Sequence, residues 1–451
     1  MKDYSDAITP LDGRNRYKLN NLADHYSDFV LTRYRVFLEI ELLTKLSQYK
    51  VIRKFTKQEL TILSQCAKTF EFEEYKRVRE IEKKTNHEAK ASEEYVREYL
   101  EKKGLKDVAQ MIHFGVTSDD INNLAYAMII KDVVKKVFFP ELEAILKSLK
   151  QAANKYKSLS MLSRTHGQPA APTTLGKEYL VYYKRLKEEV EILRSLKIKG
   201  KLTGNTGNFN AHQFIFPRVD WLKFSKEFVL SLGLEPDLVT TQIEPYDSLI
   251  RLFQCLSRIN NILLGLSVDF WFYISLGYFE QKLINREVGS TAMPHKINPI
   301  YFEGAEGGFG IANALFEFYC RKLSYSRLQR DLSDSTVRRS FGVAFGYTVL
   351  SYQSINEALS RIEAHDDNIK RDLNSHFEVI SEAIQNFLRT KNYDDAYDKT
   401  KLFFRGKTVN RESIKNFIES LKIDQKDKEK LTGLFPENYT GLAKKIVNKS
   451  L

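Results

Sequence analysis

Residues 289–299, with the sequence GSTAMPHKINP, combine side-chain types that can carry out acid/base chemistry on an anion. Ser290 supplies a hydroxyl next to a second hydroxyl residue, and Lys296 supplies a cation a few positions later. Pro294 and Pro299 each remove a backbone donor and fix φ, which excludes a regular helix here. The segment is therefore predicted to be a loop that presents hydroxyls, a lysine and backbone N–H groups to a bound anion.

Five other polar clusters contain residue types suited to an anionic substrate. They occupy residues 85–88 (TNHE), 117–120 (TSDD), 164–169 (RTHGQP), 240–245 (TTQIEP) and 327–339. His166 lies just before a glycine and two prolines, so it is expected in a loop, where it can exchange a proton near neutral pH. Three of the clusters also fit structural roles: an exposed helix face at 85–88, a helix cap at 117–120 and an ion-paired helix surface at 327–339.

The side-chain types of these clusters narrow the chemistry. No grouping of His, Cys, Asp and Glu has zinc spacing, so no metal site is predicted, and no GxSxG pattern marks Ser290 as a hydrolase nucleophile. Acid/base chemistry on a polyanionic small molecule remains. Elimination beside a carboxylate fits, because one group can remove a carbon-bound proton, cations and N–H donors can hold the anionic form, and an acid can protonate the leaving atom.

Helical periodicity dominates the elements that must position these residues, so the fold is predicted to be mainly α. Apolar residues recur at three- and four-residue steps through 175–196, before a stop at Gly200, and again through 121–129. Residues 262–279 are apolar on almost every side, with Asp269 as their only charge. We expect this segment to be the centre of a helix bundle, partly covered by other subunits, and not a membrane span.

The formal net charge is +12, and the basic residues are spread along the chain and alternate with acids. No basic stripe is interleaved with aromatic residues in the way a strand-binding groove requires, so nucleic acid is not an expected partner. Solvated helix faces and an anion-binding site account for the charge. Cys66, Cys255 and Cys320 are far apart, and residues 1–13 are polar and unlike a signal peptide. Together these features predict a cytoplasmic chain without disulfides.

Residues 289–299 resemble the signature loop of the fumarase/aspartase superfamily, whose pattern is close to GSSxMPxKxNP. The histidine in the MPHK run is similar to that of the branch that releases fumarate from succinylated purine nucleotides. Further stretches resemble the same branch, and with the signature loop they extend the resemblance over essentially the whole chain. They include PLDGR at 10–14, TNH at 85–87, SRTHGQP at 163–169, GN at 207–208 and QRD at 329–331.

The resemblance implies a fold of three helical domains, in which a central bundle of long helices forms a homotetrameric core. The expected domains are residues 1–115, residues 116–364 with the signature loop, and residues 365–451. The implied reaction is elimination of fumarate from adenylosuccinate, giving AMP, and from succinylaminoimidazole-carboxamide ribotide, giving AICAR, in purine biosynthesis. No cofactor is implied, and each active site is expected to draw on three subunits.

The resemblance also implies roles for four catalytic residues. Ser290 matches the general base that takes the Cβ proton of the succinyl group, although a serine needs help to lose its own proton. His166 matches the general acid at the leaving nitrogen, and Glu303 matches the carboxylate that orients this histidine. Lys296 is expected to favour the Ser290 alkoxide and, with Asn298, to hold the succinyl carboxylates.

Further positions match residues that bind the substrate. They are Arg14, Asn86, His87, Glu88, Thr117, Ser118, Gln242, Arg330, Ser335 and Arg339. Four positions depart from the usual pattern, namely Asn15, Glu88, Tyr246 and Thr291, and none of the departures removes an acid/base group. Two other interpretations remain open: another fumarate-releasing lyase, such as one that cleaves argininosuccinate, and a non-catalytic scaffold of the same fold.

Overall fold

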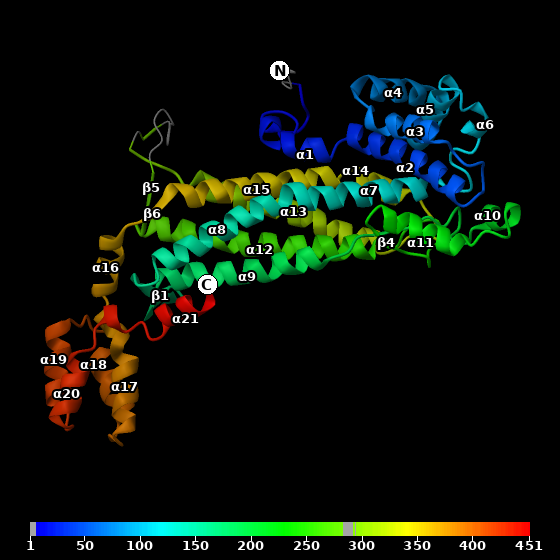
Figure 1. Ribbon diagram of the computed structural model, residues 1–451. Coiled ribbons are helices and arrows are strands. Elements are labelled where there is room, and N and C mark those ends of the chain that lie inside the picture. The colour runs from blue at the N-terminus through cyan, green and yellow to red at the C-terminus, as the bar shows by residue number, and fades with distance from the viewer. Residues whose placement is uncertain (1–5, 283–291, 294) are drawn as a thin grey trace. The chain divides into compact units, whose positions relative to one another are not determined.

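A computed structural model describes residues 6–282, 292–293 and 295–451 of the chain (Figure 1). The described part is mainly helical, so the predicted mainly α class is confirmed. Two compact units divide the chain. Unit 1 consists of Met1–Leu142, Glu189–Asn261 and Gly308–Ser351, and unit 2 consists of Glu143–Glu188, Ile262–Gly307 and Tyr352–Leu451.

Unit 1 holds the elements of the N-terminal region and two later segments. Its complete elements are η1 (Arg16–Leu19), α1 (Asn20–His25), α2 (Asp28–Gln48), α3 (Lys57–Lys68), α4 (Phe72–Thr85), α5 (Glu88–Lys102), α6 (Lys106–Ala109), α7 (Ser118–Val133), the π-helical turn η2 (Val134–Phe138), β3 (Lys199–Gly200), α10 (Asn210–Ile215), α11 (Trp221–Ser231), β4 (Glu235–Pro236) and α14 (Ser333–Arg339). Strands β3 and β4 pair in parallel.

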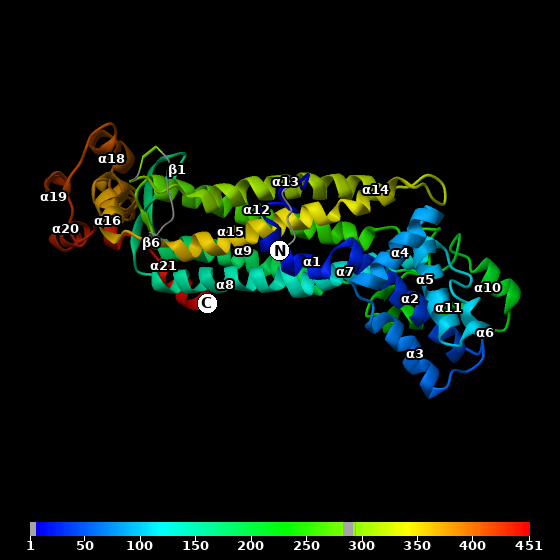
Figure 2. The same ribbon diagram turned by 90° about the horizontal axis from the view of Figure 1, so that it is seen from above.

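Helices α2 to α6 pack around one apolar core, with α3, α4 and α5 gathered beside α2 (Figure 2). Val36, Ile40 and Leu43 recur on one face of α2 and are at most 2% exposed. This spacing of three and four residues places them on the same side of the helix. The packing fixes α2 against α5, and α2 also contacts α7.

Asp120, in the first turn of α7, joins the start of this helix to the loop after β3. One carboxylate oxygen accepts from the Thr117 N–H at 2.8 Å. The other accepts from the N–H of Thr203 at 2.9 Å and lies 3.0 Å from the ammonium of Lys201. The Asp120 and Lys201 side chains are both fully buried. One buried ion pair therefore ties together two segments that are far apart in the sequence.

His113 forms a second buried charge contact in unit 1. Its Nδ1 lies 2.6 Å from Oε1 of Glu39, whose side chain is 1% exposed. Burial opposes protonation of the imidazole, but the Glu39 carboxylate outweighs it and raises the pKa of His113 above its usual value. The contribution of this pair to stability is therefore present below pH 6.5 and is lost as pH rises through the pKa of the folded state.

Replacing His113 by Asn tests this dependence, because asparagine tolerates the left-handed backbone at this position, where φ is 63°. The difference in unfolding free energy between the wild type and His113→Asn is expected to shrink as pH rises from 6 to 8.5, because the raised pKa makes the charged pair strongest below pH 6.5. Urea unfolding at several pH values measures it. A difference independent of pH would contradict the charged pair.

Unit 2 holds a hairpin and the C-terminal helices. Its complete elements are β1 (Ser160–Thr165), β2 (Gln168–Thr174), β5 (Phe279–Gln281), β6 (Ile362–Ala364), α16 (Asp366–Asn374), η3 (Phe377–Ile380), α17 (Ser381–Thr390), α18 (Ala396–Phe404), α19 (Arg411–Ser420), α20 (Gln425–Thr432), η4 (Pro436–Asn438) and α21 (Ala443–Ser450). Helices α17 to α20 surround an apolar core of their own (Figure 1). Strands β5 and β6 pair antiparallel.

Five long helices begin in one unit and end in the other. They are α8 (Phe139–Lys155), α9 (Leu175–Ser195), α12 (Asp247–Ser275), α13 (Ile300–Leu323) and α15 (Phe341–Arg361). The periodicity that predicts a helix over 175–196 corresponds closely to α9. The glycines that follow the signature loop lie within α13.

The apolar segment at 262–279 begins within α12 and ends at β5. Its charge is partnered, because the Tyr182 hydroxyl donates to the Asp269 carboxylate. Trp271 and Phe272 are 38% and 55% exposed, so the single chain leaves part of this segment uncovered. No helix in the described part of the chain has the length and hydropathy needed to cross a membrane.

Candidate functional site

A polar pocket of about 450 Å³ in unit 1 brings together residues from five separate stretches of the chain. It is lined by Arg35, Glu82, Asn86, His87, Glu88, Ala89, Thr117, Ser118, Asn122, Tyr126, Gln242, Arg330, Leu332, Ser335, Arg338 and Arg339. The lining contains most of the residues predicted to bind substrate. Four arginines give it the charge complement of a phosphate or carboxylate.

The turn between α4 and α5 presents the first part of the pocket. Asn86 ends α4 in the left-handed conformation, with φ 50°, and its N–H donates to the carbonyl of Glu82 at 2.7 Å. His87 caps α5, and its Nδ1 accepts from the Lys90 N–H at 3.1 Å. This bond assigns the proton of a neutral imidazole to Nε2. The His87 Nε2–H is therefore available to donate to an anion.

The start of α7 presents the second part. Thr117 precedes the helix and Ser118 opens it, so two hydroxyl side chains lie at the positive end of the helix dipole. The two carboxylates that follow do not line the pocket. Asp119 is fully buried and lies 3.0 Å from Arg338 and 3.6 Å from Arg330. The TSDD cluster thus serves both as a helix start and as an anchor for arginines.

Helix α14 supplies the third part. Arg339 donates to the Ser335 hydroxyl at 3.0 Å and to Oε1 of Glu88 at 2.6 Å. Arg338 is 2% exposed and pairs with Asp334 at 3.2 Å. Burial acts against the Arg338 charge, but surrounding acidic and phenolic groups outweigh it and raise the pKa of Arg338, so the guanidinium stays charged. The two adjacent arginines therefore differ: Arg338 is buried and fixed by ion pairs, whereas Arg339 reaches the surface of the pocket.

Glu88 stands between two arginines. Burial acts to raise the pKa of Glu88, but the charge of Arg35 and the hydrogen bonds from Arg339 and Arg35 outweigh it and lower the pKa to about 2. The carboxylate is therefore ionised at any physiological pH. Glu88, one of the departures from the usual pattern, is held by these two contacts.

Gln242 approaches the pocket from the loop before α12. Its side-chain amide donates to the Asn205 side chain at 2.6 Å and to the Asn205 carbonyl at 3.0 Å. Gly207 shapes this loop, because a Cβ there would lie 2.1 Å from the Thr240 carbonyl oxygen and φ is +84°. Gly204 and Gly207 both have positive φ.

Tyr246, the third departure from the usual pattern, has a structural partner. Its hydroxyl donates to Oδ2 of Asp334 at 2.5 Å, and the same aspartate pairs with Arg338. Burial raises the pKa of Tyr246 well above its usual value, so the phenol remains a donor. The tyrosine therefore helps to hold α14, which carries the pocket arginines.

His166 lies in unit 2, at the tip of the β1–β2 hairpin. Thr165 and Gln168 are the last pair of the ladder, which leaves His166 and Gly167 as a two-residue turn with φ values of 53° and 74°. Positive φ at both positions is the mark of a type I′ turn. Arg164 anchors the base of the turn through an ion pair with Asp372 at 2.7 Å. The imidazole is thus exposed on a fixed support.

The other predicted catalytic positions fall at and before the start of α13. Ser290, with its neighbour Thr291, lies outside the described residues. Lys296 is exposed, Asn298 is half-buried, and Glu303 lies in the first turn of α13. Glu303 accepts a hydrogen bond from the indole N–H of Trp271 at 3.0 Å.

Two predictions for site residues have no matching contact in the described part of the structure. Within the described residues, no hydrogen bond or ion pair joins His166 to Glu303. Arg14 is exposed in the turn before η1 and is not part of the pocket lining. The roles assigned to these residues stay predictions.

Sequence reasoning missed several pocket residues, chiefly Arg35, Asn122 and Tyr126. Each lies within a helix; Arg35 and Tyr126 have no polar motif around them, and Asn122 lies just beyond the TSDD cluster. Arg35 shares its face of α2 with the buried Thr32 and Glu39, so polar residues at helical spacing were the one signal for it. Arg338 belonged to a recognised cluster, but nothing in the sequence separates it from its neighbour.

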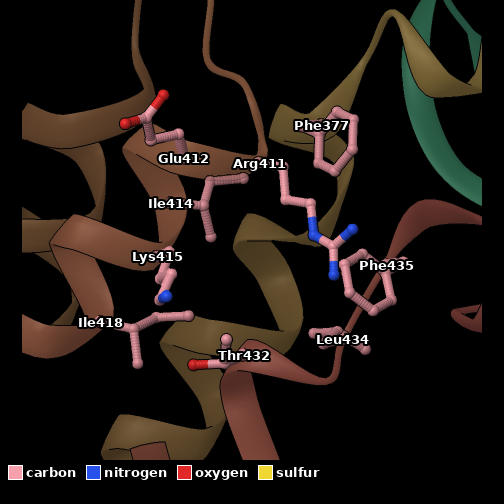
Figure 3. Close-up of a pocket in the computed structure, with 9 residues that line it drawn as sticks. All are labelled: Phe377, Arg411, Glu412, Ile414, Lys415, Ile418, Thr432, Leu434 and Phe435. Carbon is pink, nitrogen blue, oxygen red and sulfur yellow. The ribbon is translucent and has the colours of Figure 1, made fainter.

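A second pocket, of about 370 Å³, lies among the C-terminal helices and contains none of the predicted site residues (Figure 3). Arg411 places its guanidinium 4.5 Å from the ring centre of Phe435, and Ile414 and Ile418 form an apolar wall. In the part of the chain that the structure describes, no cluster of His, Cys, Asp and Glu is suited to a metal ion.

Comparison with known proteins identifies the fold and the family. A family model described as "Lyase" matches residues 24–310, and one described as "Adenylosuccinate lyase C-terminal" matches residues 326–440. The solved fumarate lyase from Mesorhizobium sp. BNC1 is 18% identical, with a TM-score of 0.80 over 95% of this chain and 96% of that chain. The 3-carboxy-cis,cis-muconate lactonizing enzyme from Pseudomonas putida has a TM-score of 0.78 at 15% identity, over 95% of each chain.

This fold and these matches define a lyase of the fumarase/aspartase superfamily, an enzyme class that the signature loop predicted. Adenylosuccinate lyases from Legionella pneumophila (strain Corby) and Escherichia coli (strain K12) are 44% and 40% identical, each over 98% of this chain and 98% of the relative. The chain belongs to the adenylosuccinate lyase family.

Proposed function

We propose that this enzyme eliminates fumarate from adenylosuccinate and from succinylaminoimidazole-carboxamide ribotide. The observation that carries the proposal is the pocket in unit 1, where Arg330, Arg339 and Ser335 converge with His87 and the start of α7. These groups suit the phosphate and the polar parts of a nucleotide, because guanidinium groups and helix N-termini bind phosphate oxygens.

The proposed chemistry needs one base and one acid. Ser290, as its alkoxide, takes a proton from Cβ of the succinyl group, and the electrons of that C–H bond form the double bond of fumarate. The C–N bond then breaks, and its electron pair stays on the leaving nitrogen, which His166 protonates. Lys296 and Asn298 hold the succinyl carboxylates and favour the doubly charged form. Glu303 orients His166.

The support for these roles is chemical type and local setting. His166 is exposed on a hairpin turn with a fixed base, as a group that must reach a substrate requires. Because its unperturbed pKa is near neutrality, an imidazole gives and takes protons at working pH. Ser290 depends on a neighbouring cation to lose its proton, and Lys296 is the cation in the same loop.

We propose that the active enzyme is a homotetramer whose active sites combine residues of three subunits. The exposed aromatic groups of α12, Trp271 and Phe272, and the exposed Ile311 and Phe318 of α13 support an apolar contact between copies. A Cβ added at Gly304, Gly307 or Gly310 would meet open space, which leaves α13 accessible to the backbone of another helix. The three domains at 1–115, 116–364 and 365–451 and a cytoplasmic location complete this proposal.

The direct test supplies each succinylated compound to the purified chain and quantifies both products. AMP and fumarate are expected in equal amounts from adenylosuccinate, and AICAR and fumarate from the ribotide. Argininosuccinate is the control substrate and is expected to give no fumarate, because it carries no phosphate for the pocket arginines. Absence of product from both succinylated nucleotides would contradict the proposed specificity, and fumarate from argininosuccinate would favour the other lyase.

A further inference from the structure

We propose that Arg35 is a positioning residue of the nucleotide pocket, which holds Glu88 so that Arg339 stays available to the ligand. The inference rests on the proposed function, since the ligand in question is the anionic end of a nucleotide. Arg35 belongs to no motif of the sequence, and it acts through its neighbours.

Arg35 connects three helices through one buried side chain. It lies on α2 and is 5% exposed. Its Nε donates to Oδ1 of Asn122 on α7 at 2.8 Å, and one terminal nitrogen donates to Oε2 of Glu88 on α5 at 2.7 Å. A planar guanidinium can make both bonds at fixed relative directions, which an ammonium cannot. Arg35 therefore sets the α4–α5 turn against the start of α7, the two segments that carry His87 and Ser118.

Glu88 divides its two oxygens between unequal partners. Oε2 faces the buried Arg35, and Oε1 accepts from Arg339, whose side chain is 55% exposed. An arriving phosphate competes with Glu88 for Arg339, because both are anions that a guanidinium binds at short range. The Arg35 side chain cannot move with Arg339, because it is 5% exposed and lies where α2 packs against α5 and α7. The buried pair thus keeps Glu88 in place while Arg339 changes partner.

Loss of Arg35 changes this competition. The freed carboxylate can turn both oxygens toward Arg339, and a bidentate pair withholds that guanidinium from the ligand. Removing the negative charge of Glu88 removes the competitor. The effect of Arg35 on nucleotide binding must then depend on whether residue 88 is charged, whereas a residue that only stabilises the fold shows no such dependence.

The experiment is a double-mutant cycle on AMP binding and on turnover, with Arg35→Met, Glu88→Gln and the double variant. Arg35→Met is expected to raise the Kd for AMP and the KM for adenylosuccinate about tenfold, the loss associated with one hydrogen bond to a charged group. The change in kcat is expected to stay within about threefold, because the chemistry lies with other residues. In the Glu88→Gln background, the same Arg35→Met change is expected to cost less than about threefold.

Two further variants separate positioning from folding. Arg35→Lys keeps the positive charge but cannot donate to Asn122 and Glu88 in the same fixed geometry, so its Kd for AMP is expected to lie between those of the wild type and Arg35→Met. Arg97→Met is the matched control, because Arg97 pairs with the 8% exposed Glu93 on the same helix, α5, and is not part of the pocket lining. It is expected to lower Tm without changing the Kd for AMP.

Equal effects of Arg35→Met in the two backgrounds would overturn the inference, and so would an unchanged Kd. The proposed function is tested separately by the wild type. If the wild type binds AMP but does not cleave adenylosuccinate, the proposed function is wrong, and the binding cycle still decides the role of Arg35. A wild type that does not bind AMP would overturn both.

Discussion

Chains that carry His166→Ala and chains that carry Ser290→Ala are each expected to lose elimination activity, yet a mixture of the two is expected to regain part of it. Each single change removes one partner of the acid/base pair, which lowers kcat on the order of 10²- to 10⁴-fold. If the pair comes from different subunits, random exchange restores both groups at about a quarter of the sites. Fumarate release after subunit exchange measures the recovery.

The controls for this experiment are self-mixtures of each variant and a proof of exchange by mass-tagged chains. His166→Asn is a useful companion, because asparagine keeps the left-handed turn at φ 53° and removes the acid. Near-normal turnover in Ser290→Ala would show that another group is the base. Failure to regain activity after verified exchange would contradict sites shared between subunits.

Replacing Lys201 by Met is expected to destabilise the protein by about 3–5 kcal/mol, the usual loss when one partner of a buried ion pair is removed. Its ammonium lies 3.0 Å from Asp120 and donates to the Gly204 carbonyl at 3.1 Å, with no exposed area. Without it, Asp120 is a buried charge held by backbone N–H groups alone. The free energy of unfolding in urea measures the loss.

The double variant Asp120→Asn/Lys201→Met is the appropriate comparison. It removes both charges, so it is expected to be less destabilised than the sum of the single changes. The surface pair Lys155–Glu363, with both side chains more than half exposed, supplies a control, since Lys155→Met is expected to cost under about 1 kcal/mol. A loss below about 1 kcal/mol for Lys201→Met would contradict the importance of the buried pair.

The long helices could be predicted from the sequence because periodic burial repeats over many turns. The pattern at 175–196 predicted α9 to within a residue. The β1–β2 hairpin could not be predicted in this way, because Pro169 and Pro172 within β2 argue against a strand. The ladder forms nonetheless, and Arg164 and Asp372 tie it to a helix two hundred residues later.

The candidate site could be predicted only in part, because only some of its residues belong to a motif. Motif residues such as Ser118 and Arg339 could be recognised in the sequence, and the structure brings them into one pocket. Arg35 and Asn122 could not, because their importance comes from one contact between α2 and α7 that only the folded chain creates. The partners of Arg338 could not be predicted from the sequence either, because Asp119 and Tyr126 come from α7, about two hundred residues earlier in the chain.

The hairpin turn restricts which residues can replace His166 in related chains. A left-handed backbone outside glycine favours Asn, Asp and His over other side chains, and of these three only histidine titrates near neutral pH. A descendant that kept the hairpin but lost catalysis would therefore drift first to Asn, Asp or Gly at this position. The residue at the tip of β1–β2 is thus a simple marker for telling working enzymes from inactive descendants in a sequence family.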